Sequence, residues 1–262
     1  MSQRGFTLIE MSFVIILIGL IVSGGLFAFA PMLLKARINQ TNANLDQVES
    51  ALELFVIRNS RLPCPADGSL PNTSANSTTY GFEQGGGTVA CTITGNNAVI
   101  PWKTLGLDES YSLDGWATRL SYWPSGTVGT STSVTTTSFL IRDGSIYPTG
   151  TFMTVTDVVS NQPVTPTTGS DQAAYVLVSH GRSQWYGWSR NSALIQPTIA
   201  VANKACNSTP DSCGAPLAVG FASGGPVGVY PPQAGTYFDD IVRWRSPAML
   251  IQLCGSGSCG NP

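Results

Sequence analysis

The chain has 262 residues, a net charge of −2 and only 11% charged residues. This balance excludes the basic surface typical of nucleic-acid-binding proteins, so no nucleic-acid partner is evident. The length allows one sizeable globular domain or two small ones behind the apolar amino terminus. Gly, Ser, Thr, Asn and Pro are abundant while Lys and Glu are scarce, which favours a β-rich extracytoplasmic domain over a cytosolic helical one.

The amino-terminal segment combines a polar leader, residues 1–5, with an apolar run over residues 6–34 that contains one charge, Glu10. A helix of this length can cross the roughly 30 Å hydrocarbon core of a bilayer. Gly5 precedes the run, whereas the small residue at an ordinary secretory cleavage site follows it. A cut at Gly5 would therefore leave the apolar helix on the mature chain. A carboxylate near the bilayer centre costs about 2.5–3.5 kcal/mol, so Glu10 requires a partner or a function. We expect no side-chain partner for it within this chain; the alternative is a plain anchor with an interfacial glutamate.

The segment Gly5-Phe6-Thr7-Leu8-Ile9-Glu10 resembles the prepilin signature of type IV pilins and of type II secretion pseudopilins. The resemblance implies that a prepilin peptidase cleaves after Gly5, that Phe6 is then N-methylated, and that Glu10 takes part in filament assembly. It also implies a single-pass protein of the bacterial inner membrane, with its carboxyl-terminal head in the periplasm or on an extracellular filament. The implied partners are other pilin or pseudopilin subunits, the prepilin peptidase and an inner-membrane assembly platform.

Several helix-weakening residues interrupt the apolar run: Gly19, Gly24, Gly25 and Pro31. Two interpretations are open. The small residues can allow close packing against neighbouring helices. Alternatively, because type IV filaments contain a locally melted segment between a glycine and a proline of this helix, the resemblance implies such a segment between Gly19 and Pro31.

Residues 35–61 carry an amphipathic helical pattern that continues the apolar helix into the head. One face is marked by residues at steps of three and four: Ile38, Thr41, Leu45, Val48, Leu52 and Phe55. The other side is polar: Asn39, Gln40, Asn44, Asp46, Gln47 and Glu49. We expect the apolar stripe to lie on the head, with a coiled-coil partner helix as the alternative. Pro63 and Pro65 cannot continue the helix and end it.

Residues 62–262 are expected to form the head, which gives an α+β fold of a long helix packed on an antiparallel sheet. Residues 66–95 have loop composition, and the Asp-Gly turn at 114–115 leads into a strand that includes Leu120 and Tyr122. Segments 114–123, 174–182 and 238–244 resemble, in the same order, segments of the major pseudopilin. Two insertions, 127–168 and 191–233, depart from that pattern and favour a minor subunit. The first is rich in β-branched residues, such as Val134, Thr136 and Ile141, and predicts extra β-hairpins.

Six cysteines in a chain that passes a membrane predict disulfides. Six cysteines allow fifteen connectivities, and nearness in the sequence favours three local bridges: Cys64–Cys91, Cys206–Cys213 and Cys254–Cys259. No cofactor is required, and calcium is the one candidate. Asp239 and Asp240 are its candidate ligands only by resemblance, because a carboxyl-terminal acidic loop of pseudopilins binds calcium. The alternative is that this pair caps a helix or faces solvent.

His180 is the only histidine, which excludes a three-histidine zinc centre. Its sequence neighbours Ser179 and Ser183 are too close to suggest a catalytic triad, so we interpret it as a turn residue with a satisfied ring. The aromatic residues Trp185, Tyr186 and Trp188 fit core packing or, alternatively, a ligand platform. The sequence therefore predicts a non-enzymatic structural subunit, with a tip adhesin or substrate-binding module on such a filament as the alternative.

Overall fold

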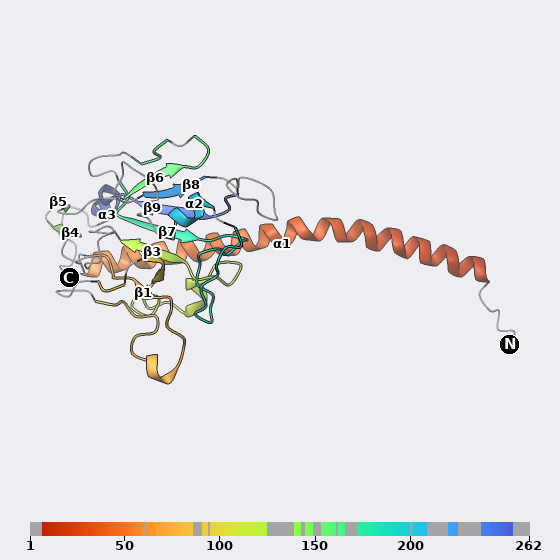
Figure 1. Cartoon of the computed structure of the whole chain (residues 1–262), viewed down its shortest axis with the longest axis horizontal. Helices are drawn as coiled ribbons and strands as arrows, with labels where there is room; N and C mark the ends of the chain where they lie inside the picture. Colours follow the sequence, from red (N-terminus) through yellow and green to blue (C-terminus); the bar gives the residue numbers. More distant parts are fainter. Residues whose placement is uncertain are drawn as a thin grey trace.

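A computed structural model describes residues 7–59, 61–85, 91–93, 95–124, 139–142, 145–148, 153–160, 162–165, 172–199, 201–208, 220–224 and 237–253. It consists of one long helix and a head built around a five-stranded sheet (Figure 1). The predicted α+β class is confirmed.

Helix α1, Leu8–Asn59, has 52 residues and is unbroken through Gly19 and Pro31. Its first part stands clear of the head and its second part runs along the sheet (Figure 1). The backbone is helical across the Gly19–Pro31 segment in this conformation. Close packing and local melting both concern the assembled filament, so both stay predictions. The helix ends just before the Pro63 and Pro65 that cannot continue it.

The second part of α1 buries the predicted stripe in the head rather than in a coiled coil. Of the predicted positions, Thr41, Leu45, Val48 and Leu52 are fully buried, whereas Ile38 and Phe55 are half-buried. Val56, which was not predicted, is also fully buried. Burial of aliphatic side chains of this size stabilises a fold by about 1.5–3 kcal/mol each. The helix therefore forms one side of the main hydrophobic core.

Two residues assigned to the polar side of this helix are buried instead. The Asn44 amide donates to the carbonyl oxygens of Ser110 (3.0 Å) and Leu113 (2.6 Å). The Glu49 carboxylate accepts from Arg243 (3.3 Å) and Arg245 (3.0 Å), and burial raises its pKa although both arginines oppose that shift. The polar side of the helix is therefore not uniformly exposed, because distant groups of the head bond to the Asn44 amide and to Glu49 Oε2, while Glu49 Oε1 is buried without a partner among the described residues.

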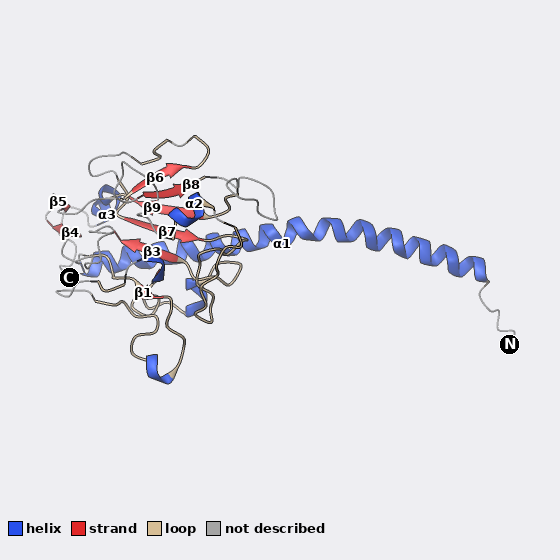
Figure 2. Cartoon of the chain, in the orientation of Figure 1, coloured by secondary structure: helices blue, strands red, loops and turns tan. Residues whose placement is uncertain are grey.

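The sheet has the strand order β1 (Ala66–Asp67), β2 (Ala98–Val99), β3 (Ser121–Pro124), β7 (Tyr175–Ser179) and β9 (Ile241–Arg245). Figure 2 labels β1, β3, β7 and β9 of this sheet. All its neighbouring strands are antiparallel, with Ser121 opposite Val178 and Ser179 opposite Ile241. The strand predicted around Leu120 and Tyr122 is confirmed. The segment predicted as loop contains β1 and the 3₁₀ turns η1 (Ser74–Asn76) and η2 (Gly95–Asn97), while η3 (Glu109–Ser112) precedes the Asp-Gly turn.

Strand β7 lies in the middle of the head and is buried on both faces. Tyr175 and Leu177 join the core beneath α1, and Val176 and Val178 join a second core with Met153. Successive side chains of a strand point to opposite faces. A continuous apolar run is therefore needed here instead of the alternation typical of a half-exposed strand.

The two insertions add further strands to the described part of the head. In the first insertion, β4 (Phe139–Arg142) and β5 (Ser145–Pro148) form the predicted kind of antiparallel hairpin. Strand β6 (Thr154–Asp157) instead pairs in parallel with β8 (Gly220–Ser223), so the two insertions meet each other. The described part of the head also contains two short helices, α2 (Ala202–Cys206) and α3 (Pro247–Leu253). Val134 and Thr136 lie outside the described residues.

The loop around Gly115 presses directly on α1 and provides a test of this packing. The Gly115 N–H donates to the Thr41 hydroxyl (2.9 Å), and that hydroxyl donates to the Arg37 carbonyl (2.9 Å). A Cβ on Gly115 would lie 2.2 Å from the Arg37 carbonyl oxygen.

We expect Gly115→Ala to destabilise the detergent-solubilised chain by about 1–3 kcal/mol, because the helix and the loop must separate. Thermal unfolding followed by circular dichroism measures this loss. Gly19→Ala is the matched control, since nothing lies within 4 Å of a Cβ there. Equal melting temperatures for the two variants would contradict the described packing.

Candidate functional site

The amino terminus of α1 is capped by hydrogen bonds between Thr7 and Glu10. The Thr7 N–H and hydroxyl both donate to one carboxylate oxygen of Glu10 (2.9 Å each), and the Glu10 N–H approaches the Thr7 hydroxyl at 3.4 Å. This is the capping-box arrangement, in which each side chain satisfies a backbone N–H of the first turn. The expectation that Glu10 has no side-chain partner in its own chain was wrong, and the signal, Thr followed three residues later by Glu, was present in the sequence.

Over residues 8–20 and 32–34, where its side chains are described, the free part of α1 exposes many apolar side chains. Exposed examples along it include Leu8, Ile9, Phe13, Ile15, Leu20, Met32 and Leu33. In a soluble protein such a surface indicates an interaction site, because contiguous apolar area is otherwise kept small. Over the described residues, no helix meets the combined length and hydropathy that a membrane span requires. Gly5 and Phe6, the predicted processing residues, lie outside the described residues.

The acidic pair predicted to bind calcium is bonded to a lysine. Lys204, on α2, is fully buried, and its ammonium group contacts Asp239 Oδ1 (2.6 Å) and Asp240 Oδ1. It also donates to the His180 carbonyl oxygen (3.1 Å). The three hydrogens of one ammonium group are thus matched by three acceptors, which is the condition for burying such a charge.

The remaining carboxylate oxygens also have partners. Asp239 Oδ2 accepts from the Ser183 N–H (2.7 Å) and the Tyr237 hydroxyl (3.0 Å), and Asp240 Oδ2 accepts from the Asn207 amide (2.9 Å). In the described part of the chain, no group of three or more His, Cys, Asp or Glu side chains could hold a metal ion. The calcium site therefore stays a prediction. Its alternative, a pair that caps a helix or faces solvent, does not hold for Asp240, which is buried and directly precedes β9.

This cluster attaches the second insertion to the common sheet. Lys204 and Asn207 belong to the insertion, whereas Asp240 directly precedes β9, and the Asn207 side chain also exchanges hydrogen bonds with Ala222 of β8. Burial acts to lower the pKa of Lys204, but the two carboxylates more than offset it and the pKa is raised. The lysine therefore stays charged at physiological pH. Sequence reasoning missed it because no local pattern links residue 204 to residues 239–240.

His180 lies at the end of β7 and is completely buried. Its Nε2 atom lies 2.9 Å from the Ser121 hydroxyl, while Asp114 bonds to the Ser179 hydroxyl (2.7 Å) instead of to the imidazole. Burial, assisted by the positive charge of Lys204, lowers the His180 pKa to about 3, so the ring is neutral at physiological pH. Burial likewise raises the pKa of Asp114 to about 6. The serine and histidine thus meet inside the core. The prediction of a satisfied ring holds for Nε2 only, because the buried Nδ1 atom has no hydrogen-bond partner among the described residues.

The structure also bears on the predicted disulfides and on the aromatic residues after His180. A disulfide joins Cys64 to Cys91, the pairing favoured by nearness in the sequence, and Cys206 is also disulfide-bonded. Cys213, Cys254 and Cys259 lie outside the described residues. Trp185 and Trp188 are buried, and Trp188 Nε1 donates to the Asn96 carbonyl oxygen (2.8 Å), which supports core packing over a ligand platform.

Residues 1–26 match the family model described as the prokaryotic N-terminal methylation motif. The chain carries the signature of type IV pilins and pseudopilins. No curated protein and no solved structure matches this pilin-like chain significantly. Proteins with this signature are typically structural, non-enzymatic filament subunits that assemble with other pilins. The signature extends over the start of α1, where the apolar side chains are exposed.

We expect Lys204→Met to destabilise the pilin-like chain by about 3–5 kcal/mol, because two buried carboxylates lose their cation. Adding Asp240→Asn to Lys204→Met should recover part of this loss. Lys103→Met, at an exposed lysine, is the control with the same charge change.

The melting temperature of the unmodified chain should be equal in calcium and in EDTA. A clear rise in calcium would instead support the predicted calcium site.

Proposed function

We propose that this chain is a minor subunit of a type IV pilus or of a type II secretion pseudopilus, processed after Gly5 and assembled through α1. The observation that carries the proposal is the methylation motif on residues 1–26, immediately at the start of a 52-residue helix whose apolar part stands outside the head. Its partners are then other pilin or pseudopilin subunits, a prepilin peptidase and an inner-membrane assembly platform.

In this proposal residues 6–34 hold the subunit in the bacterial inner membrane as a single pass, with the head in the periplasm. Assembly moves the same residues from lipid into a bundle of equivalent helices. Lipid is as apolar as another helix, so packing and polar pairing have to drive this step. The small residues Gly19, Gly24 and Gly25 permit close helix contacts, and the head then lies on the filament surface.

Glu10 has two roles in this scheme. In the monomer its carboxylate caps its own helix through Thr7. In the filament it would pair with the amino terminus of a cleaved Phe6 on another subunit. Charge pairs are stronger in a low-dielectric core than in water, and their best-attested use is to fix register. The capping bonds with Thr7 also hold the carboxylate at the start of the helix, close to its own new amino terminus.

The assignment to a minor subunit rests on the head. The insertions add the β4–β5 hairpin and the parallel β6–β8 pair to the five-stranded sheet. The buried Lys204 cluster fastens the second insertion to β9. A head enlarged by firmly attached elements is harder to repeat at every filament position, so a low-copy place in the filament is favoured.

We expect Glu10→Val and Glu10→Gln each to reduce incorporation into sheared filaments, relative to the amount in membranes, because both variants lose the charge pair. The expected reduction is about tenfold, which corresponds to about 1.4 kcal/mol. Glutamine can keep the capping box because Gln also serves at this position, so Glu10→Gln removes the charge alone. Immunoblots of sheared and membrane fractions provide the measurement.

Thr7→Val is the matched control, because it removes the cap but keeps the carboxylate, and it should assemble nearly normally. Normal assembly of both Glu10 variants would contradict the proposed role of Glu10. Loss confined to Glu10→Val and Thr7→Val would assign that role to capping instead of charge pairing.

A further inference from the structure

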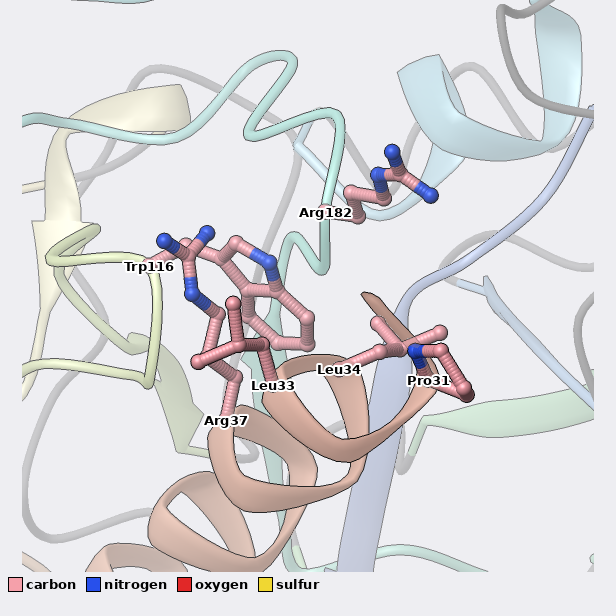
Figure 3. Close-up of a pocket in the computed structure, with 6 residues that line it drawn as sticks. All are labelled: Pro31, Leu33, Leu34, Arg37, Trp116 and Arg182. Atoms are coloured by element: carbon pink, nitrogen blue, oxygen red, sulfur yellow. The ribbon is translucent and has the colours of Figure 1, made fainter. Parts of the chain in front are cut away.

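A groove lies at the base of the head, where α1 leaves it. It consists of two adjoining hollows of about 360 and 400 Å³ that share Leu34, Trp116 and Arg182. Figure 3 shows the first hollow, in which the guanidinium groups of Arg37 and Arg182 lie on either side of the Trp116 indole, above Leu33 and Leu34. We call these two hollows the base groove.

The base groove lies at the carboxyl-terminal end of the apolar part of α1, which supplies Leu33 and Leu34 to its lining. Leu34 is the last residue of the apolar run, and Arg37 follows three residues later, which is about 4.5 Å along a helix axis. With residues 6–34 in the hydrocarbon, Arg37 and the groove would lie at headgroup depth. Tryptophan and arginine are side chains suited to that layer, because each combines apolar area with a polar group.

The charge around the groove favours an anion. From residue 11 to residue 45 the chain contains Lys35 and Arg37 but no acidic residue. Arg37 and Arg182 are both exposed. Asp239 and Asp240 line the second hollow, but Lys204 is bonded to both carboxylates. Since a guanidinium presents several donors in a planar fork, it binds phosphate oxygens well.

Trp116 adds a polar group to the groove. Its Nε1 atom is buried and has no hydrogen-bond acceptor among the described residues. Buried donors are almost always paired in proteins. A phosphate or ester oxygen that settled between the ring and Arg182 would supply the acceptor.

We propose that the base groove binds the headgroup of an anionic phospholipid, with Arg37 and Arg182 on the phosphate and Trp116 against the glycerol region. The inference rests on the proposed membrane anchorage of α1. It adds a lipid-specific contact that holds the base of the head on the bilayer before assembly, and incorporation into a filament would have to release this contact.

The test uses the full chain in a neutral detergent, exposed to equal amounts of phosphatidylglycerol and phosphatidylcholine, with bound lipid counted by native mass spectrometry. We expect a preference for phosphatidylglycerol that falls about fivefold for Arg37→Gln or Arg182→Gln and about 25-fold for the double variant. Arg58→Gln, at an exposed arginine near the far end of the same helix, is the control and should keep the full preference.

An unchanged preference in the double variant would overturn the inference, and so would an equal loss in Arg58→Gln, which would indicate net charge alone. Unchanged lipid binding with impaired filament incorporation would assign the groove to a second copy of the chain and would also overturn it. Flotation with vesicles tests the anchorage separately. A chain that fails to float contradicts the proposed function, whereas one that floats without lipid preference contradicts only this inference.

Discussion

The packing of the second part of α1 on the sheet is the constraint on which the rest of the structure depends. The stripe from Thr41 to Val56 buries one face of the helix in the head. Buried polar contacts from Asn44 and Glu49 then fix how the helix is placed and rotated, because an unsatisfied amide or carboxylate there would be costly. Since the helix is continuous, fixing this part also fixes where the apolar part emerges, clear of the head and available to lipid or to neighbouring helices (Figure 1).

The continuity of α1 also fixes the positions of the charged groups at the two ends of its apolar part. At one end, the Thr7–Glu10 cap places a carboxylate at the start of the helix. At the other, the Gly115 loop holds Trp116 beside Arg37 at the base of the head. Between them lie only apolar, small or uncharged residues up to Lys35. A subunit built this way has charged groups near both ends of its apolar segment, which suits a helix that must be held first in a bilayer and then in register within a filament.

Local patterns predicted what depends on neighbouring residues. The apolar run, the stripe of α1 and the Cys64–Cys91 bridge could be inferred from periodicity, composition or nearness, whereas the segment that contains β7 was singled out only by its resemblance to the major pseudopilin. The cap formed by Thr7 could also have been predicted from Thr followed three residues later by Glu, but it was overlooked. Contacts between distant segments could not be predicted, because nothing near Lys204 indicates Asp240 and nothing in β6 indicates that it pairs with β8. For the same reason the burial of Asn44 and Glu49 was not predicted, since Leu113 and Arg245 contact them from distant parts of the chain.

The claim that α1 becomes the shared core of a filament can be tested most directly at the amino terminus. The measurement is the intact mass of the subunit recovered from sheared filaments of its own host, under conditions that keep the disulfides. The account predicts the mass of residues 6–262 with one added methyl group and intact disulfides. Assembled material that still has the mass of residues 1–262 would contradict it.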